Sequence, residues 1–176
     1  IQSSEIALDD LWGFEEEIEK YECSDKDISK LIKEISNATH PVIVFGQGVR
    51  SANMISLFKD VVESLDIPVA PAAVLKKSDF ILSLGTSHSV SFAVEKDKKF
   101  ACVNIDENIL NKDDLEIDIP IHGDLKSFFP KLKEALASLD LKFTSWMNSC
   151  SDIKEKNKLI TKKHHYNPIN SYYLLS

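Results

Sequence analysis

The sequence predicts an α/β domain with a doubly wound, mostly parallel sheet that carries helices on both faces. Short apolar runs alternate with amphipathic segments through the middle of the chain, an order typical of this class. The runs are nearly continuous rather than alternating, as in strands that are buried on both sides. Residues 40–70 contain one complete strand–turn–helix–strand unit with glycines at the turn, and such a unit requires parallel strands.

The first part of this order consists of two helices and a strand. Residues 24–38 predict a helix with an apolar stripe, in which Ser24 and Asp27 have a capping-box-like spacing. A strand follows over residues 42–45 and ends at the glycine turn. Ser51 is placed to cap the next helix, whose apolar residues recur at helical spacing.

The second part continues the alternation. Further strands are predicted over residues 67–70, 79–84, 100–105 and 117–121. The last of these contains Pro120, which removes one hydrogen-bond donor from the ladder and favours an edge position. Asp124 can cap the helix that comes next, in which Pro130 has either to kink the helix or to delay its start. A final helix is expected over residues 143–166, before a turn.

The domain organisation follows from length and composition. A chain of 176 residues with 43% hydrophobic content suits one such domain. We expect residues 1–22 to form an incoming interdomain linker and residues 23–140 to form the α/β domain. Residues 141–176 are expected to be a helical linker towards a further, C-terminal domain, so the chain reads as a piece of a longer protein.

Charge is spread unevenly along the chain. The formal net charge is −7, residues 1–40 alone carry a net −7, and residues 142–165 carry a net +4. Solvated faces are the commonest explanation of such runs. Because Arg50 is the only arginine and the basic run is not interleaved with aromatic residues, no nucleic-acid partner is expected.

Membrane insertion and disulfide formation are not expected either. No apolar run approaches the roughly 20 residues of a membrane helix, and no secretory signal opens the chain. The three cysteines, Cys23, Cys102 and Cys150, are odd in number and widely spaced, and they match neither a metal site nor a disulfide framework. This usage favours a reducing, cytoplasmic location.

A candidate ligand site lies where the predicted strands end. Small or acidic residues follow the strands: Gly46, Gln47 and Gly48, then Gly85 and Thr86, then Asp106 and Glu107, then Gly123 and Asp124. The carboxyl ends of parallel strands lie along one edge, so backbone N–H groups and helix N-termini could bind an anionic ligand there. A carboxylate such as that of Asp106 accepts hydrogen bonds from ribose or adenine but repels phosphate, which favours the sugar or base end of a nucleotide.

The glycine pattern alone does not decide whether a ligand binds. The segment GQGVRS departs from the dinucleotide fingerprint G-x-G-x-x-G because Ser51 stands at the third glycine position. The strand at residues 67–70 also ends without the acidic residue that would hold an NAD ribose. A tight turn that needs no ligand explains the two glycines equally well.

No segment supplies a convincing set of catalytic groups. Ser87, His88 and Ser89 put a base beside two hydroxyls, but adjacent residues rarely face each other and no third triad member is evident. His164 and His165 lie at a lysine-rich helix end, where histidine commonly complements the helix dipole. We therefore assign no catalytic residue and no metal ligand.

Six segments, taken in order, resemble one enzyme family. They are IQSSEI, ATHPVIVFGQGVR, ESLDIPVA, LKKSDFILSLGT, VNIDEN and IPIHGDLKSFFPKLKEAL. Their order and approximate spacing are similar to those of the central domain of thiamine-diphosphate-dependent enzymes, closest to the acetolactate synthase-like branch. The resemblance covers nearly the whole chain.

The resemblance implies an activity that this chain cannot perform alone. Full-length members cleave or form carbon–carbon bonds next to the carbonyl of a 2-oxo acid, with thiamine diphosphate as electron sink and Mg²⁺ anchoring its diphosphate. Their catalytic glutamate lies in a pyrimidine-binding domain and their G-D-G…N metal motif in a pyrophosphate-binding domain. The resemblance therefore implies an inactive scaffold, partnered by those two domains of the same polypeptide, in a homodimer or homotetramer.

The resemblance also suggests FAD or ADP as the ligand of the strand ends. In the acetolactate synthase branch the central domain holds FAD, and the matching positions are Gly46, Gln47, Gly48, Gly85, Thr86, Asp106, Glu107, Asp124 and Leu125. Two departures weaken this match. The chain has Thr86-Ser87-His88 where the family often has G-x-R, and residues 71–78 replace a much longer Gly-rich segment. We therefore predict that this chain alone carries no tightly bound FAD.

Two further expectations follow. If residues are missing after Ala70, the Cα atoms of Ala70 and Pro71 should lie well beyond the ~3.8 Å of a trans peptide. The alternative function is an independent nucleotide-binding module of the same fold, serving regulation or electron transfer without thiamine chemistry. A G-D-G…N motif downstream would favour the enzyme, and a stop codon soon after Ser176 would favour the module.

Overall fold

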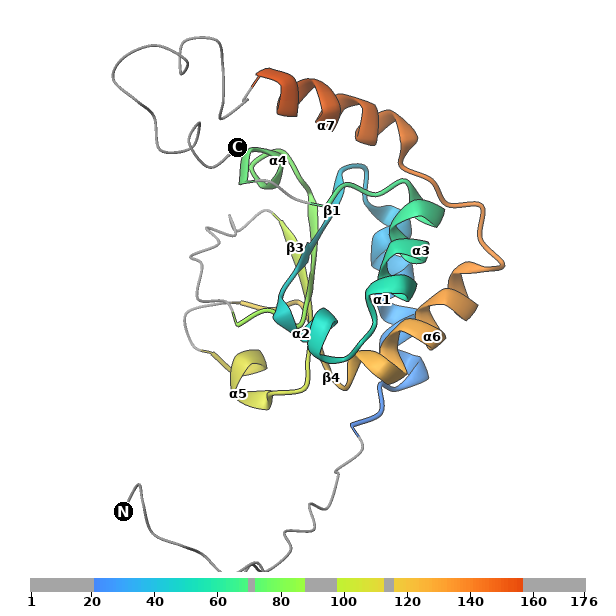
Figure 1. Cartoon of the computed structure of the whole chain (residues 1–176), viewed down its shortest axis with the longest axis vertical. Coiled ribbons are helices and arrows are strands. Elements are labelled where there is room, and N and C mark those ends of the chain that lie inside the picture. Colours follow the sequence, from blue (N-terminus) through green and yellow to red (C-terminus); the bar gives the residue numbers. More distant parts are fainter. Residues whose placement is uncertain (1–20, 70–71, 88–97, 113–115, 157–176) are drawn as a thin grey trace, which may run out of the picture.

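Four parallel strands form the centre of the structure, a computed structural model that describes residues 21–69, 72–87, 98–112 and 116–156 (Figure 1). The strands are β1 (Pro41–Phe45), β2 (Phe80–Leu84), β3 (Lys99–Asn104) and β4 (Ile119–His122), and they lie side by side in this order. Every neighbouring pair among these four strands is parallel. The predicted parallel sheet is therefore confirmed, with Pro120 in an edge strand as expected.

The strand predicted over residues 67–70 is the exception. Within the described residues it is reduced to one parallel bridge between Ile43 and Val69, supported by a 3.0 Å hydrogen bond from the Ile43 amide to the carbonyl oxygen of Pro68. The reason is a lack of donors, since the Ile67 amide bonds to Val62 at the end of the preceding helix and Pro68 has no N–H. Because Ile43 also pairs with β2, Val69 lies on the other side of β1, and the chain reverses its direction across the sheet there.

Helices lie on both faces of the sheet, as predicted. Figure 1 shows three longer helices on one face: α1 (Asp25–Asn37), α3 (Ile55–Leu65) and α6 (Leu125–Leu136). The short helices α4 (Ala72–Leu75) and α5 (Glu107–Leu110) lie on the other face. The described part of the chain contains no helix that is both long and apolar enough to cross a membrane.

Two helix starts agree with the sequence. The Ser24 hydroxyl accepts a hydrogen bond from the Asp27 amide and donates one to the Asp27 carboxylate at 2.6 Å, which is the predicted capping arrangement at α1. Asp124 caps α6 by accepting from the Lys126 amide at 2.9 Å. Since α6 begins at Leu125 and contains Pro130, the proline does not delay its start.

The helix predicted to start at Ser51 is wrong in its first turns. A short helix, α2 (Gln47–Ser51), begins directly after Gly46, and α3 begins only at Ile55, so Ser51 ends one helix and caps neither. The chain breaks at Asn53, which has a φ of +57°. Asparagine tolerates this left-handed conformation better than most residues, which explains why the break falls there.

The last described helix, α7 (Thr144–Lys156), is anchored to the sheet. Phe143, Trp146 and Cys150 are buried against the rest of the fold. The indole N–H of Trp146 donates to the carbonyl oxygen of Pro41 at 2.9 Å, and its ring meets the edge of His40. The first part of the expected helical linker therefore packs on the domain.

Several predictions concern residues outside those that the structure describes. These are the linker over residues 1–20, the joint between Ala70 and Pro71, and the segments that contain His88 and residues 157–176. The three cysteines lie within the described residues, and all are free and buried. Burial raises the pKa of the Cys102 thiol to about 12 and also raises those of Cys23 and Cys150.

Candidate functional site

The candidate site is the carboxyl edge of the sheet, which we define by the residues that follow the four strands: Gly46, Gly85, Ile105 and Gly123. In an open sheet of this kind the usual ligand crevice lies where the chain reverses its direction. Here that place lies between the ends of β1 and β2, because Val69 and β2 flank β1 on opposite sides.

The crevice between β1 and β2 is closed by backbone. The amide of Gly46 donates to the carbonyl oxygen of Leu84 at 2.9 Å, and the amide of Gly48 donates to that of Gly85 at 3.1 Å. A Cβ atom on Gly46 would overlap the carbonyl oxygen of Gly85, and one on Gly48 would lie 2.8 Å from the Gly85 Cα atom. Gly85 itself has a φ of +56°. The glycines are therefore required by the contact between the two loops.

The other two strand ends are bonded in the same way. The amide of Gly85 donates to the carbonyl oxygen of Val103 at 3.0 Å, and the amide of Gly123 donates to that of Asn104 at 3.0 Å. The N–H groups of Gly46, Gly48, Gly85 and Gly123 thus all have acceptors within the protein. In this arrangement none of the four can donate its main hydrogen bond to an anionic ligand.

A buried polar side chain links the middle of the edge. The Asn104 amide group donates to the carbonyl oxygen of Thr86 at 2.8 Å, and its oxygen accepts from the backbone N–H of Asp106 at 3.0 Å. The hydroxyls of Ser83 and Thr86 lie 2.7 Å apart in the interior. The sequence analysis missed Asn104, although a polar residue at the end of the apolar run FACVN was a signal for it.

A cavity of about 270 Å³ lies beside these loops. It contains five of the ten predicted site residues, namely Gly48, Gly85, Gly123, Asp124 and Leu125. The structure adds five residues that were not predicted: Ser51, Ala52, Asn104, Ile105 and Lys126.

The other five predicted residues lie elsewhere. Gly46 and Gln47 line a separate groove. Thr86 is buried, with its hydroxyl beside that of Ser83. Asp106 caps α5 by accepting from the Asn108 amide at 3.0 Å, and Glu107 is the first residue of that helix. Neither of these acidic residues lines the cavity.

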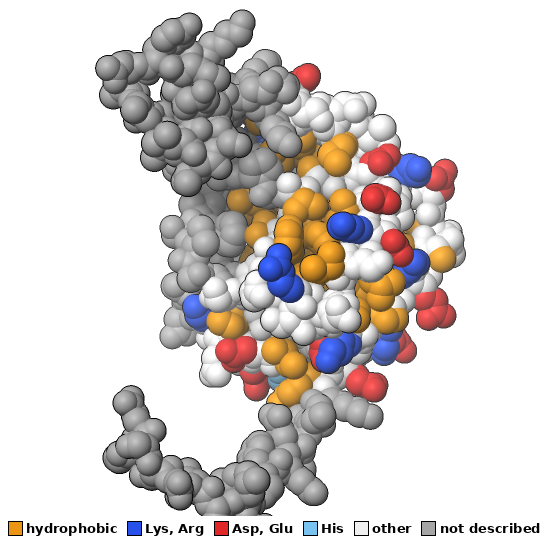
Figure 2. All heavy atoms as spheres, in the orientation of Figure 1, with side chains coloured by type: hydrophobic (Ala, Val, Ile, Leu, Met, Phe, Trp, Pro, Cys, Tyr) orange, Lys and Arg blue, Asp and Glu red, His pale blue; other side chains and the backbone are white. Residues whose placement is uncertain are grey.

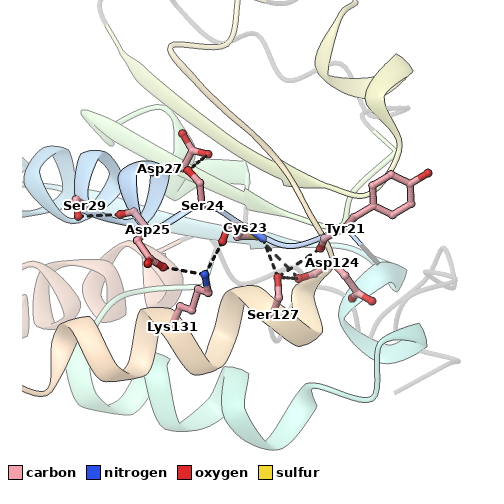
Figure 3. A network of polar contacts seen from close by, with 9 residues as sticks. All are labelled: Tyr21, Cys23, Ser24, Asp25, Asp27, Ser29, Asp124, Ser127 and Lys131. Atoms are coloured by element: carbon pink, nitrogen blue, oxygen red, sulfur yellow. Dashed lines mark hydrogen bonds and ion pairs between the residues drawn. The ribbon is translucent and has the colours of Figure 1, made fainter. Parts of the chain in front are cut away.

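The entering chain is fastened to α6 next to this cavity (Figure 3). The Asp124 amide donates to the carbonyl oxygen of Tyr21 at 2.7 Å, and the Cys23 amide donates to the Ser127 hydroxyl at 2.9 Å. Lys131 donates to the carbonyl oxygen of Cys23 and forms an ion pair with Asp25 at 2.7 Å, which raises the pKa of its ammonium group. A Cβ atom on Gly123 would overlap the sulfur of Cys23, so this glycine too is required by packing.

The residues present do not fit a dinucleotide such as FAD. The cavity is smaller than the roughly 300–1,000 Å³ of typical ligand sites, and the glycine amides beside it are already bonded. Its ionisable lining residues are one acid, Asp124, and one base, Lys126. Among the residues that the structure describes, no group of three or more His, Cys, Asp or Glu side chains could hold a metal ion.

Comparison with known proteins gives a sequence relative. No family model matches the chain. The acetolactate synthase large subunit of Lactococcus lactis subsp. lactis (strain IL1403) is 26% identical over 170 residues, which cover 78% of this chain. The match spans 29% of the length of that protein.

Two solved structures share the fold. Benzoylformate decarboxylase from Polynucleobacter necessarius matches with a TM-score of 0.56 and 15% identity, over 72% of this chain and 31% of its own. A putative thiamin diphosphate-dependent enzyme from Mycobacterium smegmatis matches with a TM-score of 0.59 and 12% identity, over 69% of this chain and 29% of its own.

These findings identify the chain in two steps. The fold defines the class, an α/β domain built on a parallel sheet whose chain reverses its direction beside β1. The sequence relative and the two structures then point to one family, so the predicted resemblance to a domain of thiamine-diphosphate-dependent enzymes is confirmed.

Proposed function

We propose that this chain is the central domain of a thiamine-diphosphate-dependent, acetolactate synthase-like enzyme that acts on 2-oxo acids by carboligation or decarboxylation. The observation that carries the proposal is the match to an acetolactate synthase large subunit, which covers 78% of this chain and 29% of that protein. A segment of that share, with the fold described above, has the size of one domain of a larger enzyme.

In this proposal the domain is a scaffold, and the catalytic groups lie in other domains of the same polypeptide. Thiamine diphosphate and Mg²⁺ would be held by a pyrimidine-binding and a pyrophosphate-binding domain, in a homodimer or homotetramer. The packing of α7 on β1 and the fastening of residues 21–25 to α6 suit this role, because both ends of the domain are held in fixed positions. Three free, buried thiols support a reducing, cytoplasmic location.

We further propose that the carboxyl edge does not retain FAD in this chain. The loops at Gly46 and Gly85 contact each other where a flavin nucleotide would have to enter. Losing even about 4 kcal/mol of contacts weakens binding roughly a thousandfold. The purified chain should therefore show no flavin absorbance and release no flavin on denaturation, and a yellow protein with stoichiometric FAD would contradict this.

The activity is tested on the longer gene product that contains this chain. We expect the longer product to consume pyruvate or another 2-oxo acid only when thiamine diphosphate and Mg²⁺ are present, and residues 1–176 alone to consume none. A longer product without thiamine-dependent activity on any 2-oxo acid would overturn the proposal. A gene that ends soon after Ser176 would instead favour an independent nucleotide-binding module.

A further inference from the structure

The largest apolar feature of the described surface is a groove between α2 and α3, which we name the α2–α3 groove. It has a volume of about 460 Å³. Its lining residues are Phe45, Gly46, Gln47, Val49, Arg50, Ile55, Phe58 and Lys59. Figure 2 shows an apolar area over this part of the molecule, with positive side chains on its borders.

The groove exposes side chains that a folded domain normally covers. Phe45 is 50% exposed although it is the last residue of a core strand, and Ile55 is 41% exposed at the start of α3. The Phe45 ring lies against that of the buried Phe58, with the ring centroids 4.8 Å apart. Together these side chains form a continuous apolar floor. Contiguous apolar surface of this kind usually marks a contact with another segment or molecule.

The rim of the groove is positively charged. Arg50, the only arginine of the chain, lies on α2, and Lys59 lies on α3. Among the residues that the structure describes, neither takes part in an ion pair. The neighbouring Asp60 is paired with Lys133 at 2.6 Å and does not neutralise them. The occupant that fits is therefore apolar with acidic flanks.

Residues 1–20 of this chain have that composition. They carry seven acidic residues and a single lysine, which gives a net charge of −6. Leu11, Trp12 and Phe14 form an apolar group in their middle, between the acidic pair Asp9–Asp10 and the run at residues 15–17. The composition thus places aromatic side chains between carboxylates, as the floor and rim of the groove require.

The segment can reach the groove from where it enters the domain. The carbonyl oxygen of Tyr21 bonds to Asp124 beyond the end of β4, and Phe45 ends β1 at the same edge. Three strand spacings separate β4 from β1, a distance of about 14 Å. Trp12 precedes Tyr21 by nine residues, which span up to about 30 Å when extended.

A second copy of the chain fits less well. In a symmetric dimer the same patch meets itself, so two grooves would bring Arg50 and Lys59 of both copies face to face. Such like-charge contacts oppose association.

We propose that the acidic segment at residues 9–17 docks in the α2–α3 groove of its own chain. Trp12 and Phe14 cover Phe45 and Ile55, and the flanking carboxylates pair with Arg50 and Lys59. The docked segment crosses the carboxyl edge as a strap and shields the exposed end of β1. This inference does not depend on the proposed enzymatic function, since it concerns a contact within residues 1–176.

The test uses tryptophan fluorescence of the whole chain. The chain has two tryptophans, and Trp146 is only 6% exposed, so the difference between the chain and its Trp12→Phe variant reports on Trp12. Trp12 should be protected from acrylamide quenching in the unaltered chain. In Arg50→Glu/Lys59→Glu the ratio of docked to undocked segment should fall roughly tenfold, the effect expected from two exposed ion pairs. Trp12 should then be quenched as fully as in urea.

Matched variants separate docking from general charge effects. Lys33→Glu/Lys77→Glu makes the same change in charge at two exposed lysines outside the groove and should leave the protection of Trp12 unchanged. Replacing Glu15, Glu16 and Glu17 by lysine should expose Trp12, and combining it with Arg50→Glu/Lys59→Glu should restore protection. Circular dichroism verifies that each variant is folded.

Three results would overturn the proposal. Trp12 could be fully quenched in the unaltered chain, or its protection could survive Arg50→Glu/Lys59→Glu. Protection that appears only at high protein concentration would mean that a second copy occupies the groove.

Discussion

The two ends of the sheet are held together by different physical means. At the amino end one carboxylate, that of Asp79, accepts hydrogen bonds from the Thr39 amide, the Thr39 hydroxyl and the His40 amide, at 2.6 to 2.9 Å. At the carboxyl end the loops at Gly46 and Gly85 touch through backbone alone. The amino end therefore depends on a charge, whereas the carboxyl end depends on the absence of side chains.

The difference explains why a glycine pattern can be mistaken for a ligand site. A loop that cradles a phosphate and a loop that packs on another loop both require residues without a Cβ atom. What separates them is the partner of the freed space and of the amide groups. Here the partner is a neighbouring loop, and the amides of Gly46 and Gly48 are bonded to it or to the strand before it.

The largest effect is expected at the carboxyl end, from Gly46→Ala. The added methyl group would overlap the Gly85 carbonyl oxygen, so the two loops must separate and lose their hydrogen bonds. We expect a loss of roughly 3 kcal/mol or more in the free energy of unfolding, measured by urea denaturation. Ser51→Ala, a change on the exposed end of α2, should stay within about 0.5 kcal/mol. Equal stability of Gly46→Ala and the unaltered chain would refute the packing explanation.

A smaller loss is expected at the amino end, from Asp79→Ala. The change removes a charged acceptor and leaves three donors without it, which should cost about 2 kcal/mol. Asp60→Ala is the matched control, because it removes a carboxylate from an exposed ion pair with Lys133 and should cost less than about 1 kcal/mol. If both variants lost the same stability, Asp79 would be no more than another surface charge.

The pH dependence should distinguish the two ends. Burial alone would raise the pKa of Asp79, but the hydrogen bonds from Thr39 and His40 outweigh it and hold the pKa below the ordinary value of 3.8. Its stabilising contribution is therefore present above pH 3.8 and is lost as the pH falls through the lower, folded-state pKa. Asp79→Asn should flatten the decline of stability in this acidic range, and Gly46→Ala should leave its slope unchanged. Parallel slopes for Asp79→Asn and the unaltered chain would be the contrary outcome.

The smallest effect concerns the thiols between the two ends. Burial raises the pKa of Cys102 in β3 to about 12, and Cys23 and Cys150 are also raised and buried. Since the thiolate is the reactive form, alkylation of the native chain near neutral pH should be slow at all three residues. Mass spectrometry should find all three modified only after unfolding. Rapid native labelling of Cys102 would mean that β3 opens readily.

Local signals in the sequence predicted the local features well. The parallel strands follow from continuous apolar runs, and the caps at Ser24 and Asp124 follow from residues within three positions of each helix start. The strand at residues 67–70 was overestimated because apolar content suggested pairing, whereas the ladder needs donors that Ile67 and Pro68 do not supply.

The features that the sequence did not predict depend on contacts between distant segments. The start of α2 at Gln47 is set where Gly46 meets Gly85, a contact across 39 positions of the chain. The anchoring of Trp146 to Pro41 spans 105 positions, and Asn104 acts through Thr86. Half of the candidate site was located correctly, because strand ends can be read from apolar runs, but the direction of each loop cannot.

The anchored helix α7 also sets a distance. The chain enters at Tyr21, which is bonded beyond the carboxyl end of β4, and α7 is bonded through Trp146 to Pro41 at the amino end of β1. The two attachment points therefore lie at opposite ends of the sheet, and the length of a five-residue strand, about 17 Å, separates those ends. Whatever precedes Tyr21 and follows α7 in a longer polypeptide is held apart by a rigid ruler, whose length could be changed only by adding or removing strand residues.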